Sequence, residues 1–176
     1  MSSFDFADLA TVSAGLLVAR VVLGFLMAAH GSQKLFGWFG GHGLAGTGGF
    51  FESLGFRPGR TFALAAGLAE TVGGLLVALG LLGPVGPALV VSVMVVAGFA
   101  VHRSGGLFAM TNGVELPLLY SASAIALALT GPGAYSLDAL LGLESLWTRA
   151  VVGTAIAAGI IGGIANLIVR RTPAAA

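Results

Sequence analysis

The sequence contains no cysteine and few charged residues. Without cysteine, the chain forms no disulfide, holds no iron–sulfur cluster or thiolate zinc site, and performs no thiol or persulfide chemistry by itself. Charged residues make up 9% of the 176 positions, whereas a soluble domain carries about 25%. The net charge is only +1, so there is no basic field of the kind that binds nucleic acid. The sequence also shows no nucleophilic triad and no metal-ligating cluster.

Hydrophobic residues, in contrast, fill 57% of the chain, and the mean hydropathy is +1.00. A soluble fold of this composition would have too little polar surface to cover itself. Residues 1–11 contain Asp5 and Asp8 but no lysine or arginine, which does not fit a secretory signal, because such a signal begins with a basic region. We therefore expect an integral membrane protein that is embedded in the lipid bilayer from its first apolar segment onward.

Five apolar stretches are candidates for membrane helices, since a bilayer core needs about 20 helical residues. They span residues 9–30, 61–82, 85–101, 115–130 and 147–169, and the fourth is short. The predicted fold is an all-α membrane protein. It consists of one antiparallel transmembrane bundle over residues 1–176, with a core at 9–140 and an added helix at 147–170.

Two longer connections join these stretches. Residues 31–60 are rich in glycine and aromatic residues, which is typical of a segment that lies at the membrane interface or re-enters it. Residues 131–146 begin Gly-Pro-Gly and contain Ser136, a candidate N-cap for a short surface helix.

The distribution of lysine and arginine predicts the orientation, because cytoplasmic loops carry the excess of these residues. With five spans, one side of the membrane receives six cations and the other side receives only Arg149. The expected location is the plasma membrane, with the N-terminus outside and the C-terminus in the cytoplasm. The six cations are Lys34, Arg57, Arg60, Arg103, Arg170 and Arg171.

Arg20 and Glu70 are charges inside the first two predicted spans. A charge at the bilayer centre costs at least about 2.5–3.5 kcal/mol, so it usually faces the bundle interior and has a partner. Arg20 precedes His30 by about 15 Å of helix, and Glu70 follows Thr61 by about 13 Å, measured from the same face. We therefore expect an Arg20–Glu70 salt bridge, which either fixes the helix register or belongs to a functional site.

Further polar residues are expected at the cytoplasmic ends of the helices. Above the Arg20–Glu70 pair they would form a funnel for a ligand with a polar head and an apolar body, such as a quinone. No catalytic residue and no metal ligand is assigned. The predicted ligand-binding residues are Arg20, His30, Gln33, Lys34, Glu70, His102 and Glu115.

Several of these residues have simpler interpretations. Lys34 and Arg103 are suited to extend from a helix end to lipid headgroups. Glu115 follows Asn112 at the spacing of a capping box, so it is also a candidate cap of the fourth span. His30 and His102 are a less favoured pair of haem ligands, since the sequence has no c-type attachment motif.

The sequence resembles the DoxX family of membrane proteins. The resemblance covers about residues 13–140 and includes Arg20 and Gly24, the run His-Gly-Ser-Gln-Lys-Leu-Phe-Gly at 30–37, and Glu70. It continues with His102, the Asn-Gly-x-Glu run that ends at Glu115, and the Gly-Pro-Gly-x-Tyr-Ser-x-Asp run at 131–138. The family core implied by this resemblance has four helices, so residues 147–176 look like an addition.

The resemblance implies a role without fixing it, because the family includes subunits of thiosulfate:quinone oxidoreductase, a subunit of a mycobacterial membrane complex and distant cargo receptors. The leading hypothesis is a quinone-binding membrane subunit of an oxidoreductase complex, with a soluble or membrane redox partner. The alternatives are a non-catalytic anchor for a soluble partner and a small-solute or proton-coupled transporter. Small residues at Gly159 and Gly163 favour helix packing within the chain, with a homo-oligomer as the alternative.

Overall fold

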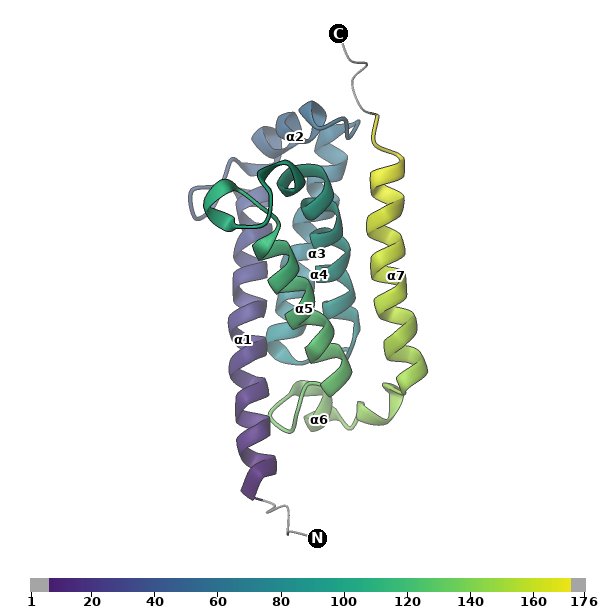
Figure 1. Cartoon of the computed structure of the whole chain (residues 1–176). Helices are drawn as coiled ribbons and strands as arrows, with labels where there is room; N and C mark the ends of the chain where they lie inside the picture. Colours follow the sequence, from purple (N-terminus) through teal and green to yellow (C-terminus); the bar gives the residue numbers. More distant parts are fainter. Residues whose placement is uncertain (1–6, 172–176) are drawn as a thin grey trace.

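A computed structural model describes residues 7–171, and every regular element in that range is helical. The long helices stand side by side as a bundle, and successive ones run in opposite directions (Figure 1). They are α1 (Ala7–Phe36), α3 (Gly59–Leu79), α4 (Val85–Ala97), α5 (Glu115–Thr130) and α7 (Arg149–Ile168). Shorter elements are α2 (Gly43–Ser53), α6 (Leu137–Leu141), a π-helical turn at Gly98–His102, and single 3-10 turns at Arg103–Gly105, Ala109–Thr111 and Glu144–Leu146.

The predicted antiparallel bundle is confirmed. Four helices in the described range are long and apolar enough to cross a membrane, at Leu9–Phe36, Gly59–Leu79, Val85–Gly105 and Arg149–Ile168. The remaining long helix, α5, has 16 residues and is about 24 Å long at 1.5 Å per residue, somewhat less than a hydrocarbon core of about 30 Å. It packs against α4 within the bundle.

Helix α1 is longer than the sequence suggested. We expected it to end at His30, but it continues to Phe36. Gly31 and Ser32 looked like the start of a loop, yet both are buried within the helix. The Ser32 hydroxyl donates to the carbonyl of Ala28 at 2.8 Å, so it is satisfied inside the helix and does not interrupt it.

Glycines bring α1 and α3 into close backbone contact, and this is the most extensive helix pair in the bundle. A Cβ on Gly24 would overlap the backbone of Gly74 and Ala78, and a Cβ on Gly31 would overlap Thr71. Small residues allow this close approach. Close packing matters in lipid because the hydrophobic effect does not drive helices together there. The contact fixes the register of α1 on α3, and Met27 is fully buried beside it.

The added helix α7 packs against α4 by the same means. A Cβ on Gly159 would overlap the carbonyl of Ala88, and one on Gly163 would lie 2.7 Å from the carbonyl oxygen of Ser92. The two glycines therefore serve packing within the chain, as favoured from the sequence.

The second connection is anchored by Asp138, which is completely buried. Its carboxylate accepts from the backbone N–H groups of Leu82 and Gly83 at 2.9 and 2.6 Å, and from Nε1 of Trp147 at 2.8 Å. These bonds join the α3–α4 turn to the segment that leads into α7. Ser136 accepts from the N–H of Ala139 at 3.1 Å and caps α6, as predicted.

The cations gather at one end of the bundle, as expected from the sequence. Lys34, Arg103 and Arg170 lie at or just beyond the ends of helices that finish there, next to α2, whereas Arg149 begins α7 at the opposite end (Figure 1). The backbone N–H of Arg171 donates to the carbonyl of Gly55 at 2.9 Å, so the end of α7 is attached to the α2–α3 connection.

The α1–α3 contact predicts a position-dependent effect of a single methyl group. Gly24→Ala should lower stability by about 1–3 kcal/mol, because its Cβ meets backbone that cannot rotate away. Gly15→Ala, on the same helix, should be neutral or stabilising, since nothing lies within 4 Å of its Cβ and alanine favours a helix. Thermal unfolding in mild detergent measures both, and equal midpoints for the two variants would contradict the packing described.

Candidate functional site

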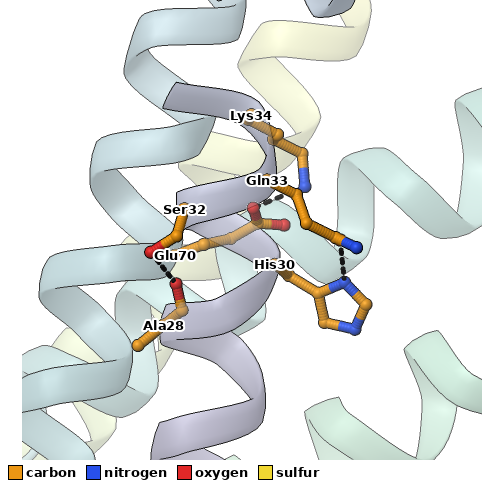
Figure 2. A network of polar contacts seen from close by, with 6 residues as sticks. All are labelled: Ala28, His30, Ser32, Gln33, Lys34 and Glu70. Carbon is orange, nitrogen blue, oxygen red and sulfur yellow. Dashed lines mark hydrogen bonds and ion pairs between the residues drawn. The ribbon is translucent and has the colours of Figure 1, made fainter. Parts of the chain in front are cut away.

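The predicted salt bridge between Arg20 and Glu70 is wrong. Glu70 pairs instead with Lys34, whose Nζ lies 2.5 Å from Oε2 of Glu70. Figure 2 shows the Lys34 side chain extending from the last turn of α1 toward the carboxylate on α3. The side chain of Glu70 is 2% exposed and that of Lys34 is 23% exposed, so the carboxylate is enclosed and the ammonium remains partly accessible.

Arg20 lies at another level of the bundle. Its guanidinium donates to the carbonyl of Ala78 at 3.1 Å and to the carbonyl of Tyr135. Ala78 is eight residues beyond Glu70, or about 12 Å along α3. The expected pairing failed because α1 runs on past His30, so the true register sets Arg20 beside the end of α3 and places Lys34 beside Glu70.

A cavity of about 370 Å³ adjoins the Lys34–Glu70 pair. We call it the Glu70 cavity. It lies between the ends of α1, α4 and α7, with α2 and α3 forming further walls. Its polar lining residues are Lys34, Glu70, Ser92, His102 and Asn166, and its aromatic lining residues are Phe50, Phe51, Phe56 and Phe62.

The structure brings together three of the seven predicted ligand-binding residues at this cavity, namely Lys34, Glu70 and His102. His30 and Gln33 lie close by on α1 but do not line it. Nδ1 of His30 donates to Oε1 of Gln33 at 3.1 Å, and Nε2 of Gln33 donates to the carbonyl of Phe39 at 3.1 Å. In Figure 2 the two side chains are directed away from Ser32. They hold the turn that follows α1.

Glu115 and Arg20 lie apart from the Glu70 cavity. The carboxylate of Glu115 accepts from the backbone N–H of Ala109 at 2.7 Å and braces the loop before α5. The capping-box interpretation is wrong, because Val114 is the N-cap of α5 and Asn112 has a left-handed conformation at φ 60°. Arg20 lines a different cavity, near the opposite end of the bundle.

His102 is oriented by its own loop. It closes the π-helical turn that follows α4, and its Nδ1 lies 3.1 Å from the carbonyl oxygen of Asn112. A carbonyl oxygen only accepts, so Nδ1 carries the proton of this bond. Nε2 has no hydrogen bond among the described residues. In the neutral ring it is an acceptor, and in the charged ring it is a donor.

Neither the aromatic walls nor Asn166 was among the predicted ligand-binding residues. Phe51, Phe56 and Phe62 form a chain of ring contacts, with centroids 5.7 and 5.3 Å apart. Phe51 comes from α2 and Phe62 from α3. Phe51 and Phe56 fall in the segment 31–60, whose composition predicts a membrane interface, and Phe62 falls in the second predicted span. Asn166 also bonds its own helix, since Nδ2 donates to the carbonyl of Gly162 at 2.8 Å.

These residues give the cavity two chemically distinct parts. The polar groups include an ammonium, a carboxylate and an imidazole, and the apolar groups include aromatic rings and alanine methyl groups. Such a lining suits a flat or elongated apolar molecule with a polar end. Within residues 7–171, no group of His, Asp and Glu side chains is arranged to hold a metal ion.

The fold and the site define a multi-pass helical membrane protein with a polar cavity between its spans. The family model DoxX matches residues 15–103. The inner membrane protein YqjF of Escherichia coli (strain K12) is 33% identical over 132 residues, which cover 72% of this chain and 92% of YqjF. The chain therefore belongs to the DoxX family. No solved structure matches it.

The Lys34–Glu70 contact predicts a large coupling between these two positions. Lys34→Met should destabilise the protein by about 3–5 kcal/mol, because it leaves an enclosed carboxylate without its cation. Adding Glu70→Gln should recover most of that loss. The matched cycle of Arg20→Met and Glu70→Gln should be additive within about 0.5 kcal/mol, since those residues are far apart. Thermal unfolding of the six proteins measures both cycles, and a coupled Arg20–Glu70 cycle would contradict the observed register.

Proposed function

We propose that this DoxX-family protein is the membrane subunit of an oxidoreductase complex and that it binds a quinone in the Glu70 cavity. The observation that carries the proposal is that Lys34, Glu70 and His102 line the same cavity as the aromatic side chains Phe50, Phe51, Phe56 and Phe62. The volume of about 370 Å³ falls in the range of about 300–1,000 Å³ that is usual for small-molecule sites.

The lining residues fit the chemistry of a quinone head. Lys34 uses one N–H on Glu70, and an ammonium has three donors, so two others are available to a carbonyl oxygen. Glu70 restrains the direction of the ammonium through the short ion pair. The rings of Phe51, Phe56 and Phe62 offer faces and edges for a flat conjugated ring.

His102 would complete the site as a proton-exchanging group. Because Nδ1 is held by the carbonyl of Asn112, Nε2 is the ring atom that is left to accept a proton from a hydroxyl or to donate one to a carbonyl. A bound quinone would supply the capacity to accept two electrons and two protons. We assign the source of those electrons to a partner protein, since the chain has no cysteine for thiol redox chemistry.

The proposed orientation places the cation-rich end, and with it the Glu70 cavity, on the cytoplasmic side. Lys34, Arg57, Arg60, Arg103 and the pair at 170–171 support this orientation through the positive-inside rule. The N-terminus would then be outside and the C-terminus in the cytoplasm. We propose the plasma membrane as the location, in keeping with the name of the relative YqjF as an inner membrane protein.

A non-catalytic anchor for a soluble partner is the second candidate function. It is favoured by the loop before α5, where Met110 is 98% exposed and Phe108 is 63% exposed at the cation-rich end. Exposed apolar side chains of this kind suit either the headgroup region or a docked protein. An anchor of this kind would need no ligand in the Glu70 cavity.

Quinone binding is tested with purified protein in mild detergent and a short-tailed quinone titrated by calorimetry. His102→Leu should weaken binding about tenfold through the loss of one hydrogen bond, and Ala69→Phe should abolish it by filling the cavity, which Ala69 lines. His42→Leu is the matched control, because this exposed histidine lies outside the cavity.

Folding of each variant is verified by its thermal midpoint. Quinone binding that is absent in the wild type, or equally strong in folded His102→Leu and Ala69→Phe, would contradict the proposal. Recovery of a soluble protein with the wild type but not with Met110→Ser, together with no quinone binding, would favour the anchor.

A further inference from the structure

A second cavity, of about 480 Å³, lies toward the other end of the bundle. We call it the Arg20 cavity. It is enclosed by the end of α3, the start of α4, the end of α5 and the segment that begins α7. Most of its lining is apolar, with Leu127 and Val152 among the wall residues. Its charged lining residues are Arg20, Glu144 and Arg149.

Arg20 is held firmly at the wall of this cavity. Its side chain is 2% exposed, and its two terminal nitrogens donate to the carbonyls of Ala78 and Tyr135. Ala78 lies in the last turn of α3, where backbone carbonyls lack helical partners and the helix dipole is negative. Gly80 follows in a left-handed conformation at φ 63°, and a Cβ there would overlap the guanidinium. The fold thus leaves room for Arg20 at this point.

The charge of Arg20 is not neutralised by a carboxylate in the described part of the chain. Both bonded partners are neutral carbonyls, and Nε is buried without any hydrogen bond. Asp138 makes no ion pair with Arg20, and its two oxygens accept instead from Leu82, Gly83 and Trp147. The helix dipole supplies only about half an elementary charge. Among the described residues, the enclosed guanidinium therefore has no carboxylate in direct contact at this largely apolar cavity.

The exposed charged residues that line the cavity do not change its net formal charge. Glu144 and Arg149 are both exposed and line the cavity, and their formal charges cancel. The cavity wall as a whole carries one excess positive charge, located on the enclosed Arg20. Since α3 ends at Leu79, Arg20 lies beside the end of α3, at the opposite end of that helix from the Glu70 cavity.

We infer that the Arg20 cavity binds an amphipathic anion, in which an acyl chain carries a carboxylate or phosphate head. The oxyanion would supply the missing counter-charge for Arg20. The acyl chain would lie against the apolar wall that includes Leu127 and Val152. This site is separate from the Glu70 cavity and does not depend on quinone binding.

The requirement for a charged head on the ligand is tested with delipidated protein in mild detergent, by native mass spectrometry and by titration. Oleate or dioleoylphosphatidylglycerol should bind at least about ten times more tightly than methyl oleate or dioleoylglycerol, because only the charged heads form a charge-assisted hydrogen bond with Arg20. Preference for oleate assigns a carboxylate, and preference for the phospholipid assigns a phosphate. Equal binding of charged and neutral probes, or no binding of any probe, overturns the inference.

The location is tested by filling the cavity. Arg20→Gln is the direct variant, but it also removes the N–H groups that donate to the carbonyls of Ala78 and Tyr135. Gly153→Leu avoids this difficulty, since Gly153 lines the cavity and nothing lies within 4 Å of an added Cβ. It should weaken anion binding at least tenfold, whereas Gly15→Leu, an open glycine outside the cavity, should bind as the wild type does. Unchanged binding by folded Gly153→Leu overturns the inference.

Discussion

The close approach of α1 and α3 determines where Arg20, Lys34 and Glu70 lie relative to one another. Gly24 and Gly31 on one helix meet Gly74 and Thr71 on the other without room for a Cβ. Backbones this close have only one register, because any shift along the helix axis would drive a side chain into backbone. In that register the last turn of α1 is next to Glu70 and the middle of α1 is next to the end of α3. The Lys34–Glu70 pair and the environment of Arg20 both follow from it.

This register gives the two ends of the molecule different chemistry. At the cation-rich end, a compensated ion pair and an oriented imidazole meet an aromatic wall. At the other end, Arg20, which has no ion-pair partner in the described residues, lies at a cavity whose wall is mostly apolar. The first cavity therefore suits a neutral molecule with hydrogen-bonding carbonyls, whereas the second suits an anion. A single salt bridge between Arg20 and Glu70 would have cancelled both charges at one depth and left neither site.

The positions of the spans could be predicted from the sequence, because hydropathy alone reports which segments lipid tolerates. The Ser136 cap and the grouping of cations at one end were predictable for similar local reasons. The partner of Glu70 could not be predicted, because a glycine is common both at helix ends and at close contacts between helices. Gly31 suggests a helix end, but it lies at a helix contact, and α1 continues for six more residues, which moves its terminus by about 9 Å.

Hydrogen bonds between residues far apart in the sequence could not be predicted from local sequence patterns. Asp138 follows a helix cap and looks like a surface residue, yet its partners Leu82 and Gly83 lie more than 50 positions away. The aromatic walls of the Glu70 cavity pose the same problem, since Phe51 and Phe62 belong to different helices. The family resemblance identified the motif residues as a set but did not say which of them are in contact. That information lies in the helix register.

The register itself is open to a direct measurement, because the natural chain has no cysteine to interfere. Two double-cysteine proteins sharing one position, Lys34→Cys with Glu70→Cys and Arg20→Cys with Glu70→Cys, can be treated in native membranes with a short bifunctional thiol reagent. The linked peptides are then quantified by mass spectrometry. The structure predicts efficient linkage within the first protein and almost none within the second. Preferential linkage of positions 20 and 70 would contradict the account.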